Sequence, residues 1–166
     1  LGHHRLGVIT ADRAGNDRAR ARFEGVCAAM AAAGLDPASL PVEEVPYAIA
    51  DGAAAFARLM AAHPCPTAVL CGNDVLAAGA ITQARADGID VPGDVSVTGF
   101  DDIELAAILT PALTTVHVPH REMGRRAARM LLDMRAGGAP PPKLRLEAGI
   151  KWRASLGPPP PGGDGG

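Results

Sequence analysis

Four polar side chains stand directly after short apolar runs, at places where a ligand can be bound. Asn73 and Asp74 follow one run, and Asp101 and Asp102 follow another. An amide offers a donor and an acceptor to a ligand hydroxyl, and a single carboxylate can accept two hydrogen bonds from vicinal hydroxyls or a ring N–H. Paired acid–base catalysis requires a second carboxylate facing the first, which adjacent residues rarely provide. This pattern favours binding of a sugar or a nucleobase over catalysis.

Helix capping competes with ligand binding at each of these positions. A side-chain oxygen of Asn73 or Asp74 can accept the free N–H groups of the first turn of a following helix, so capping accounts for one of the two. A pocket role for Asn73 stays open beside it. Of the second pair, we expect Asp101 to bind the ligand and Asp102 to cap the next helix.

Arg22 and Tyr47 are further candidates for ligand contact. Arg18, Arg20 and Arg22 open a predicted helix, where positive charge opposes the helix dipole. A solvated basic face accounts for two of them, and the third is then held there for another reason. Tyr47, the only tyrosine, follows a predicted strand and can offer a ring-shaped ligand a flat apolar face with a polar edge. A partly buried loop aromatic is the alternative.

Enzyme signatures are absent from the sequence. There is no Gly-x-Ser-x-Gly elbow, no phosphate-binding Gly-x-x-x-x-Gly-Lys, and no Gly-x-Gly-x-x-Gly after the first predicted strand. His63, His117 and His120 have no carboxylate partner that the sequence can place, so we expect structural or surface residues. The three cysteines form no Cys-x-x-Cys pair, which is typical of reduced thiols. We therefore predict neither an enzyme nor a bound cofactor, metal or disulfide.

Alternating strands and helices must position these side chains. Apolar runs bounded by turn residues predict strands at 5–10, 42–46, 67–71, 95–98, 114–118 and 144–148. Apolar residues at helical spacing predict helices at 17–33, 51–63, 74–88, 102–109 and 120–136. The alternation is typical of an α/β fold with a doubly wound, mostly parallel sheet and helices on both faces. In such sheets ligands bind beyond the carboxyl ends of the strands, where Asn73 and Asp101 stand.

Composition and charge narrow the class of protein. The 166 residues are 48% hydrophobic, 20% charged and 3% aromatic, which indicates a globular chain with a mainly aliphatic core. A net charge of -2 is too close to zero for the surface to hold DNA or an anionic membrane by itself. No apolar run reaches the roughly 18 residues of a membrane span, and no secretory signal opens the chain. We expect a cytoplasmic protein without membrane contact.

Three segments carry a resemblance to a known family. Regulators of the LacI/GalR family are similar in order and spacing to the segments Pro66–Ala80, Gly88–Asp102 and Pro111–Val116. The similarity covers nearly the whole chain except its Pro- and Gly-rich end. It implies a periplasmic-binding-protein-like fold of two α/β subdomains with a small effector between them. It also implies an N-terminal helix-turn-helix that binds operator DNA as a homodimer.

The resemblance assigns roles to individual residues. Arg22, Asn73 and Asp101 match effector-contacting positions of the family, and Tyr47 matches an aromatic residue that lines the pocket. Many relatives have a polar residue near position 118, where Val118 offers no hydrogen bond. The implied ligand is a small, sugar-like effector. Its binding would favour one closure angle of the two subdomains and so change the spacing of the DNA-binding headpieces.

The family pattern also divides the chain. It implies a C-terminal effector-binding subdomain at 1–118, a segment of the N-terminal subdomain at 119–147, a return at 148–156, and a disordered Pro/Gly tail at 157–166. The headpiece and most of one sensing subdomain would precede Leu1. The helix 120–136 would then lack a partner for its apolar face, so we expect it to pack abnormally, to pair with another copy or to be mobile.

The resemblance also predicts where two copies of the chain would meet. The resemblance places the dimer contacts on the helix Leu76–Arg85 and on the segment Leu105–Ala112.

Three rival functions stay open: a periplasmic sugar-binding protein of a transporter, a nucleotide-dependent enzyme on a doubly wound sheet, and an interaction domain with a degenerate pocket. A helix-turn-helix upstream would support regulation, and a secretory signal would support the first rival.

Overall fold

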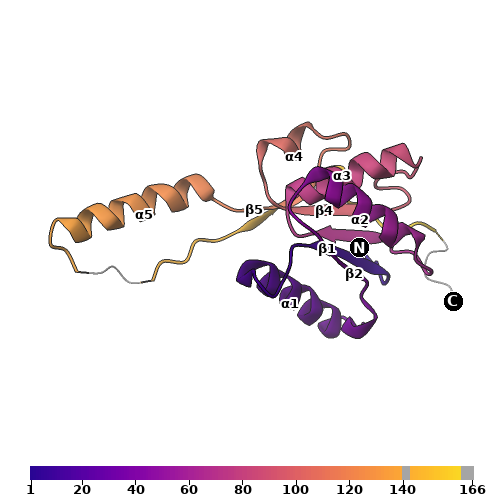
Figure 1. The fold of residues 1–166 in the computed structure, drawn as a ribbon, viewed down its shortest axis with the longest axis horizontal. Helices are drawn as coiled ribbons and strands as arrows, with labels where there is room; N and C mark the ends of the chain where they lie inside the picture. The colour runs from indigo at the N-terminus through magenta and orange to yellow at the C-terminus, as the bar shows by residue number, and fades with distance from the viewer. Residues whose placement is uncertain (140–142, 162–166) are drawn as a thin grey trace.

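The computed structural model describes residues 1–139 and 143–161, in which strands and helices alternate (Figure 1). The strands are β1 (Leu6–Thr10), β2 (Val42–Glu44), β3 (Ala68–Cys71), β4 (Ser96–Asp101), β5 (Thr114–His117) and β6 (Gly149–Lys151). The helices are α1 (Asp17–Ala32), α2 (Ile49–Ala61), α3 (Asp74–Ala86), α4 (Glu104–Ile108) and α5 (His120–Arg135), with a short 3-10 turn at Pro37–Ser39. One sheet has the order β2-β1-β3-β4-β5-β6 and is parallel except for β6. The predicted mostly parallel α/β fold is confirmed.

Local signals set the ends of the helices. The side chain of Asn16 accepts two backbone N–H groups of the first turn of α1, at 3.1 Å each. The same helix ends just before Gly34, whose positive φ of 77° is the conformation that glycine adopts at low cost. Asn73 caps α3 by accepting the N–H of Leu76 at 2.9 Å. Of the two caps that the sequence offered for α3, Asn73 is therefore the one used.

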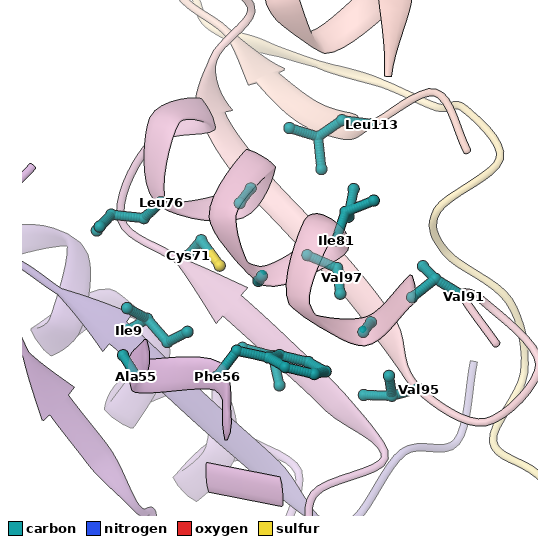
Figure 2. Close-up of a cluster of buried hydrophobic side chains, with 14 of the residues drawn as sticks. Ile9, Ala55, Phe56, Cys71, Leu76, Ile81, Val91, Val95, Val97 and Leu113 are labelled. Atoms are coloured by element: carbon teal, nitrogen blue, oxygen red, sulfur yellow. The ribbon is translucent and has the colours of Figure 1, made fainter. Parts of the chain in front are cut away.

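The helices α2 and α3 cover one face of the sheet and bury the larger core. Figure 2 shows Phe56 from α2 and Leu76 from α3 gathered with Ile9 of β1, and all three are fully buried. The two helices approach closely where Gly52 and Gly79 stand. A Cβ atom at Gly79 would collide with the backbone of α2, so this approach requires glycine.

The helix α1 lies on the opposite face of the sheet (Figure 1). Met30 of α1 is buried against Val8 of β1, with Leu70 of β3 packed beside them. Next to α1 the same face carries a hollow of about 680 Å³, lined mainly by apolar side chains that include Phe100 and Val116. The sheet is therefore more fully covered on the α2 and α3 face than on the α1 face.

The helix α5 projects away from the sheet (Figure 1). None of its residues is buried, and Leu131 and Leu132 are 66% and 64% exposed. This exposure agrees with the expectation that the apolar face of this helix lacks its usual partner. Among those residues, no helix combines the length and the apolar content needed to cross a membrane.

The chain returns from α5 to the sheet later than expected. The strand predicted at 144–148 is wrong, because pairing with β5 begins only at Gly149. Leu144 and Leu146 instead line a hollow with Met123 of α5, where there is no neighbouring strand to pair with.

The predicted tail starts as an anchored segment. The N–H of Gly157 donates to Ser96 Oγ at 3.0 Å, and the carbonyl of Gly157 accepts a hydrogen bond from His3 Nε2 at 2.9 Å. The prediction of a disordered tail is therefore wrong at its first residue. Residues 162–166 lie outside the described residues.

Candidate functional site

Arg22 and Asp101 meet at the carboxyl ends of the central strands. Arg22 Nη2 lies 3.5 Å from Asp101 Oδ1, and both side chains are 25% exposed. Arg22 Nη1 donates a hydrogen bond of 2.6 Å to the carbonyl of Gly72, directly after β3. The guanidinium also lies 3.9 Å from the centre of the Phe100 ring, within cation–π distance. Three contacts therefore hold the Arg22 guanidinium at this edge of the sheet.

The backbone that presents Asp101 has an unusual conformation. Asp101 has a φ of 109° and Asp102 a φ of 55°, and they are the non-glycine residues with positive φ in the described chain. Side chains rarely adopt this region, and such strain persists only where surrounding contacts enforce it. Strained turns of this kind concentrate at binding sites, and here the turn directs the Asp101 carboxylate toward Arg22.

Asp102 does not cap a helix, so that prediction is wrong. Its Oδ1 accepts a hydrogen bond of 2.6 Å from Arg153 Nη2, and its Oδ2 lies 2.8 Å from His117 Nδ1. The positive φ turns the carboxylate toward β5, and α4 begins after Ile103 with no side-chain cap. Burial alone raises the pKa of the Asp102 carboxyl, but the hydrogen bonds and charges of Arg153 and His117 outweigh it and hold that pKa below its ordinary value.

Asp74, which the sequence marked as a possible helix cap, has a structural role between elements. It is 1% exposed, and its carboxylate accepts hydrogen bonds from Thr115 Oγ1 at 2.5 Å and from the N–H of Ile103 at 2.9 Å. Burial raises the pKa of Asp74, the charges of Asp101 and Asp102 act in the same direction, and the two hydrogen bonds oppose them only in part. Asp74 thus ties α3 to β5 and to the residue after the strained turn. Its position in the sequence, after an apolar run and at the start of a helix, did not reveal these bonds to Thr115 and Ile103.

Two of the histidines have carboxylate partners that the sequence could not place. His117 has a carboxylate partner in Asp102, and His120 Nε2 lies 3.7 Å from Asp101 Oδ1 with its side chain 57% exposed. Both pairs join residues on different elements, so sequence spacing could not reveal them. His120 adds a donor at the edge of the Arg22 and Asp101 pair.

The other two predicted site residues lie differently. Asn73 follows Gly72, the residue that binds Arg22, but its Oδ1 is engaged in capping α3. Tyr47 is 40% exposed and lines a separate hollow of about 420 Å³ at the ends of β1 and β2. Tyr47 does not line the larger hollow that contains Arg22. The structure therefore brings Arg22 and Asp101 together, places Asn73 beside them, and leaves Tyr47 apart.

The groups at this site are able to bind a polar ligand. Within 1–139 and 143–161, no three His, Cys, Asp or Glu side chains are grouped closely enough to hold a metal ion. Cys71 lies at the end of β3, but burial raises the pKa of its thiol and the charge of Asp74 adds to the shift. Because the thiolate is the reactive form, Cys71 is suited to packing. The exposed edges of Arg22, Asp101 and His120 offer donors and an acceptor to a polar ligand.

Comparison with known sequences places the chain in a family. The family model for periplasmic binding protein-like domains matches residues 1–156. The transcriptional repressor PurR of Haemophilus influenzae is 37% identical over 132 residues, which are 80% of this chain and 39% of that protein. An HTH-type transcriptional regulator of Mycobacterium tuberculosis is 39% identical over 158 residues, with 84% of this chain and 43% of that protein covered. The chain spans less than half the length of these relatives.

Solved structures give the same picture. A LacI-family regulator from Burkholderia phymatum superposes with a TM-score of 0.85 at 34% identity, covering 93% of this chain and 56% of that one. The regulator CelR in complex with cellobiose superposes with a TM-score of 0.79 at 32% identity, covering 93% and 47%. The chain belongs to the periplasmic binding protein-like domain family, in the form that LacI-family transcriptional regulators use to bind effectors.

Proposed function

We propose that this chain forms one side of the effector site of a LacI-type transcription regulator and binds a sugar-like molecule between Arg22 and Asp101. The observation that carries the proposal is the Arg22–Asp101 pair, held on a strained turn at the carboxyl ends of β3 and β4. Open parallel sheets bind ligands at this edge. The relatives are named as repressors and regulators, which favours this function over a transporter component or an enzyme.

A sugar suits the groups that converge here. Asp101 can accept hydrogen bonds from two neighbouring hydroxyls, and Arg22 can donate to a ring or hydroxyl oxygen. At 3.5 Å the pair is loose, so a ligand can insert its own hydrogen bonds without breaking a short ion pair. Two similar structures hold sugars, namely the CelR–cellobiose complex and an Enterococcus faecium regulator with bound ribose, which is 26% identical with a TM-score of 0.85. We extend that ligand class to this chain.

Regulation follows from a shift between two arrangements. An effector that contacts this chain and the other sensing subdomain favours the arrangement in which both contacts are made. Operator DNA is then read by a separate DNA-binding domain, since this chain, with a net charge of -2, has no excess of positive charge. The proposed site of action is the cell interior, where operator DNA is found.

The proposed homodimer would use only part of the expected surface. The apolar side chains of α3, such as Leu76 and Ile81, are buried in the core of the chain itself. Exposed apolar side chains nearby are Ile49 of α2, Ile103, and Ile108 of α4, which is 77% exposed. We therefore assign the dimer contact to the outer sides of α2 and α4. By the same reasoning, the unburied α5 is assigned to the sensing subdomain that this chain lacks.

The test is the effector response of a regulator that carries this chain and a DNA-binding domain. Operator binding is measured by fluorescence anisotropy with D-ribose, cellobiose and adenine as probes. Asp101→Ala removes the acceptor and should abolish the response while leaving operator affinity intact. Asp87→Ala is the matched control, because the Asp87 carboxylate bonds only its helix neighbour Gln83. An unchanged response in Asp101→Ala contradicts the proposal, and a response to adenine alone would replace the sugar class by a nucleobase.

A further inference from the structure

The segment after β6 is bonded tightly to the sheet. We call residues 152–157 the return segment. Ser155 of this segment is fully buried. Its Oγ donates a hydrogen bond to the carbonyl of Val97 at 2.6 Å and accepts one from the N–H of Thr114 at 2.9 Å. The N–H of Val97 donates to the carbonyl of Ser155 at 2.8 Å. The return segment therefore bonds to both β4 and β5, more than 40 residues away in sequence.

Arg153 extends this attachment toward the candidate site. Its Nη1 donates to the carbonyl of Leu113 at 2.8 Å, and its backbone N–H donates to Thr114 Oγ1 at 2.9 Å. Its Nη2 donates to Asp102 at 2.6 Å, where the two side chains are 22% and 11% exposed. Charge-assisted hydrogen bonds at such low exposure are the strong kind, because water competes with them poorly.

The strained turn consists of Asp101 and Asp102, the two residues with positive φ. The side-chain contacts of Asp102 are short and those of Asp101 are long. Asp102 is held by Arg153 and His117 at 2.6 and 2.8 Å, whereas Asp101 faces Arg22 and His120 only at 3.5 and 3.7 Å. The loose contacts are too weak to enforce a positive φ at two successive residues. The firm contacts at Asp102, together with the hydrogen bond from the Ile103 N–H to Asp74, hold the turn in its strained form.

We propose that Arg153 and His117 are positioning residues of the candidate site, which by holding Asp102 fix the backbone turn that directs Asp101 toward Arg22. The role in effector binding rests on the proposed function, but the positioning itself does not. If Arg153 is removed, the turn relaxes toward negative φ and the Asp101 carboxylate leaves Arg22. The segment 152–157 then affects the site although Arg153 does not line the hollow beside Arg22.

Acid should release the same anchor in the unmodified chain. The charged groups facing Asp102 are Arg153 on the return segment, His117 on β5 and Asp74 on α3. Their balance leaves the pKa of Asp102 below the ordinary value of 3.8, so the anchor is intact at neutral pH. Protonation below pH 3.8 removes the negative charge that Arg153 and His117 hold.

Amide hydrogen exchange measured by NMR tests the positioning without any ligand. In Arg153→Met, exchange at Asp101, Asp102 and Ile103 should accelerate about tenfold, while Val69 in the core keeps its rate. Arg153→Lys keeps the charge and should restore part of the protection. Arg58→Met is the matched control, since it breaks the Arg58–Glu43 pair of 2.7 Å at the opposite edge of the sheet and should leave the turn unchanged.

A second variant and a titration with sugars distinguish failure of the positioning role from failure of the proposed ligand. His117→Leu removes the other contact from a side chain that is 43% exposed, so it tests the turn even if Arg153→Met does not fold. Unchanged exchange at residues 101–103 in a folded Arg153→Met or His117→Leu chain overturns the positioning role. D-ribose and cellobiose are then added to each chain. If the turn loosens but the wild type binds neither sugar, the proposed ligand fails while the positioning stands.

Discussion

At the scale of single residues, the site depends on carboxylates with different tasks. Asp101 is partly open and loosely paired, Asp102 is tightly paired, and Asp74 is buried and hydrogen-bonded. All three lie at one edge of the sheet. Burial is the main cause that raises the pKa of Asp74, and the charges of Asp101 and Asp102 add to it. The partners of each carboxylate decide its role, because ordinary aspartates are chemically identical.

Asp74→Ala should lower the free energy of unfolding by about 2 to 4 kcal/mol, because it leaves the Thr115 hydroxyl and the Ile103 N–H buried without an acceptor. Urea unfolding followed by circular dichroism measures the change. Asp87→Ala, at an exposed position, should stay within about 0.5 kcal/mol of the wild type. Equal stability of the two variants would contradict a structural role for Asp74.

Residue roles were predictable from the sequence only in part. The helix dipole marked Arg18, Arg20 and Arg22 together, and the family resemblance selected Arg22. Asp101 stood out by its place at the end of a strand. The role of Asp102 was mistaken because its partners, His117 and Arg153, lie 15 and 51 residues away. Such contacts depend on the order of the strands in the sheet and on the positive φ of the turn, and neither can be recognised from neighbouring residues in the sequence.

At the scale of elements, local chemistry sets most boundaries. The predicted helix starts at residues 17 and 74 agree with the structure, where Asn16 and Asn73 are the caps, because capping involves neighbouring residues only. The last strand was misplaced because pairing with β5 selects 149–151 over the alternating segment 144–148. The close approach of α2 and α3 was also invisible beforehand, since it depends on glycines facing each other across two helices.

Gly79→Ala should destabilise the fold by about 2 to 3 kcal/mol, because the added methyl group overpacks a site where backbone meets backbone. Gly25→Ala is the control on α1, because its Cβ would meet no atom within 4 Å. It should raise the free energy of unfolding by about 0.5 to 1 kcal/mol, since alanine has a higher helix propensity than glycine. Thermal unfolding by circular dichroism separates the two variants. A stabilising Gly79→Ala would show that the helices do not touch there.

Trypsin should cut α5 before any other helix. The arginines of α5 stand on a helix with no buried residue, whereas Arg22 is held in packed α1 by Gly72 and Asp101. Proteases require local unfolding, which costs least where tertiary contacts are few. Mass spectrometry of a brief digest should find the first cuts between residues 121 and 145. First cuts in α1 or α2 would mean that α5 is packed in solution.

At the scale of the whole molecule, a well-packed α/β sheet carries one side of the proposed binding site and a helix with no buried residue. The core beneath α2 and α3 is complete, while the hollow beside α1 and the exposed α5 lack cover. A complete core beside uncovered apolar surface is consistent with a chain that covers 56% of the similar Burkholderia regulator structure. Function is expected from the larger assembly, and rigidity of the site from this chain.

Acid should destabilise the wild type more steeply than Asp102→Asn. The folded-state pKa of Asp102 is depressed, so its stabilising contribution is present above the unfolded value of 3.8 and is lost as pH falls below it. Urea unfolding between pH 7 and pH 2.5 measures this. The gap between the wild type and Asp102→Asn should be constant above about pH 5 and should close below pH 3.8. Parallel curves throughout would mean that Asp102 is not preferentially ionised in the folded state.

The most direct test of ligand binding at Arg22 and Asp101 is an NMR titration of this chain with D-ribose and with cellobiose. We predict saturable shifts of the amides of Gly72, Asn73 and Asp101, which disappear in Asp101→Ala and persist in Asp87→Ala. Millimolar sugar is needed, because one side of the site binds more weakly than a closed pocket. Shifts confined to the hollow around Tyr47, or shifts that survive in Asp101→Ala, would contradict the assignment of the site.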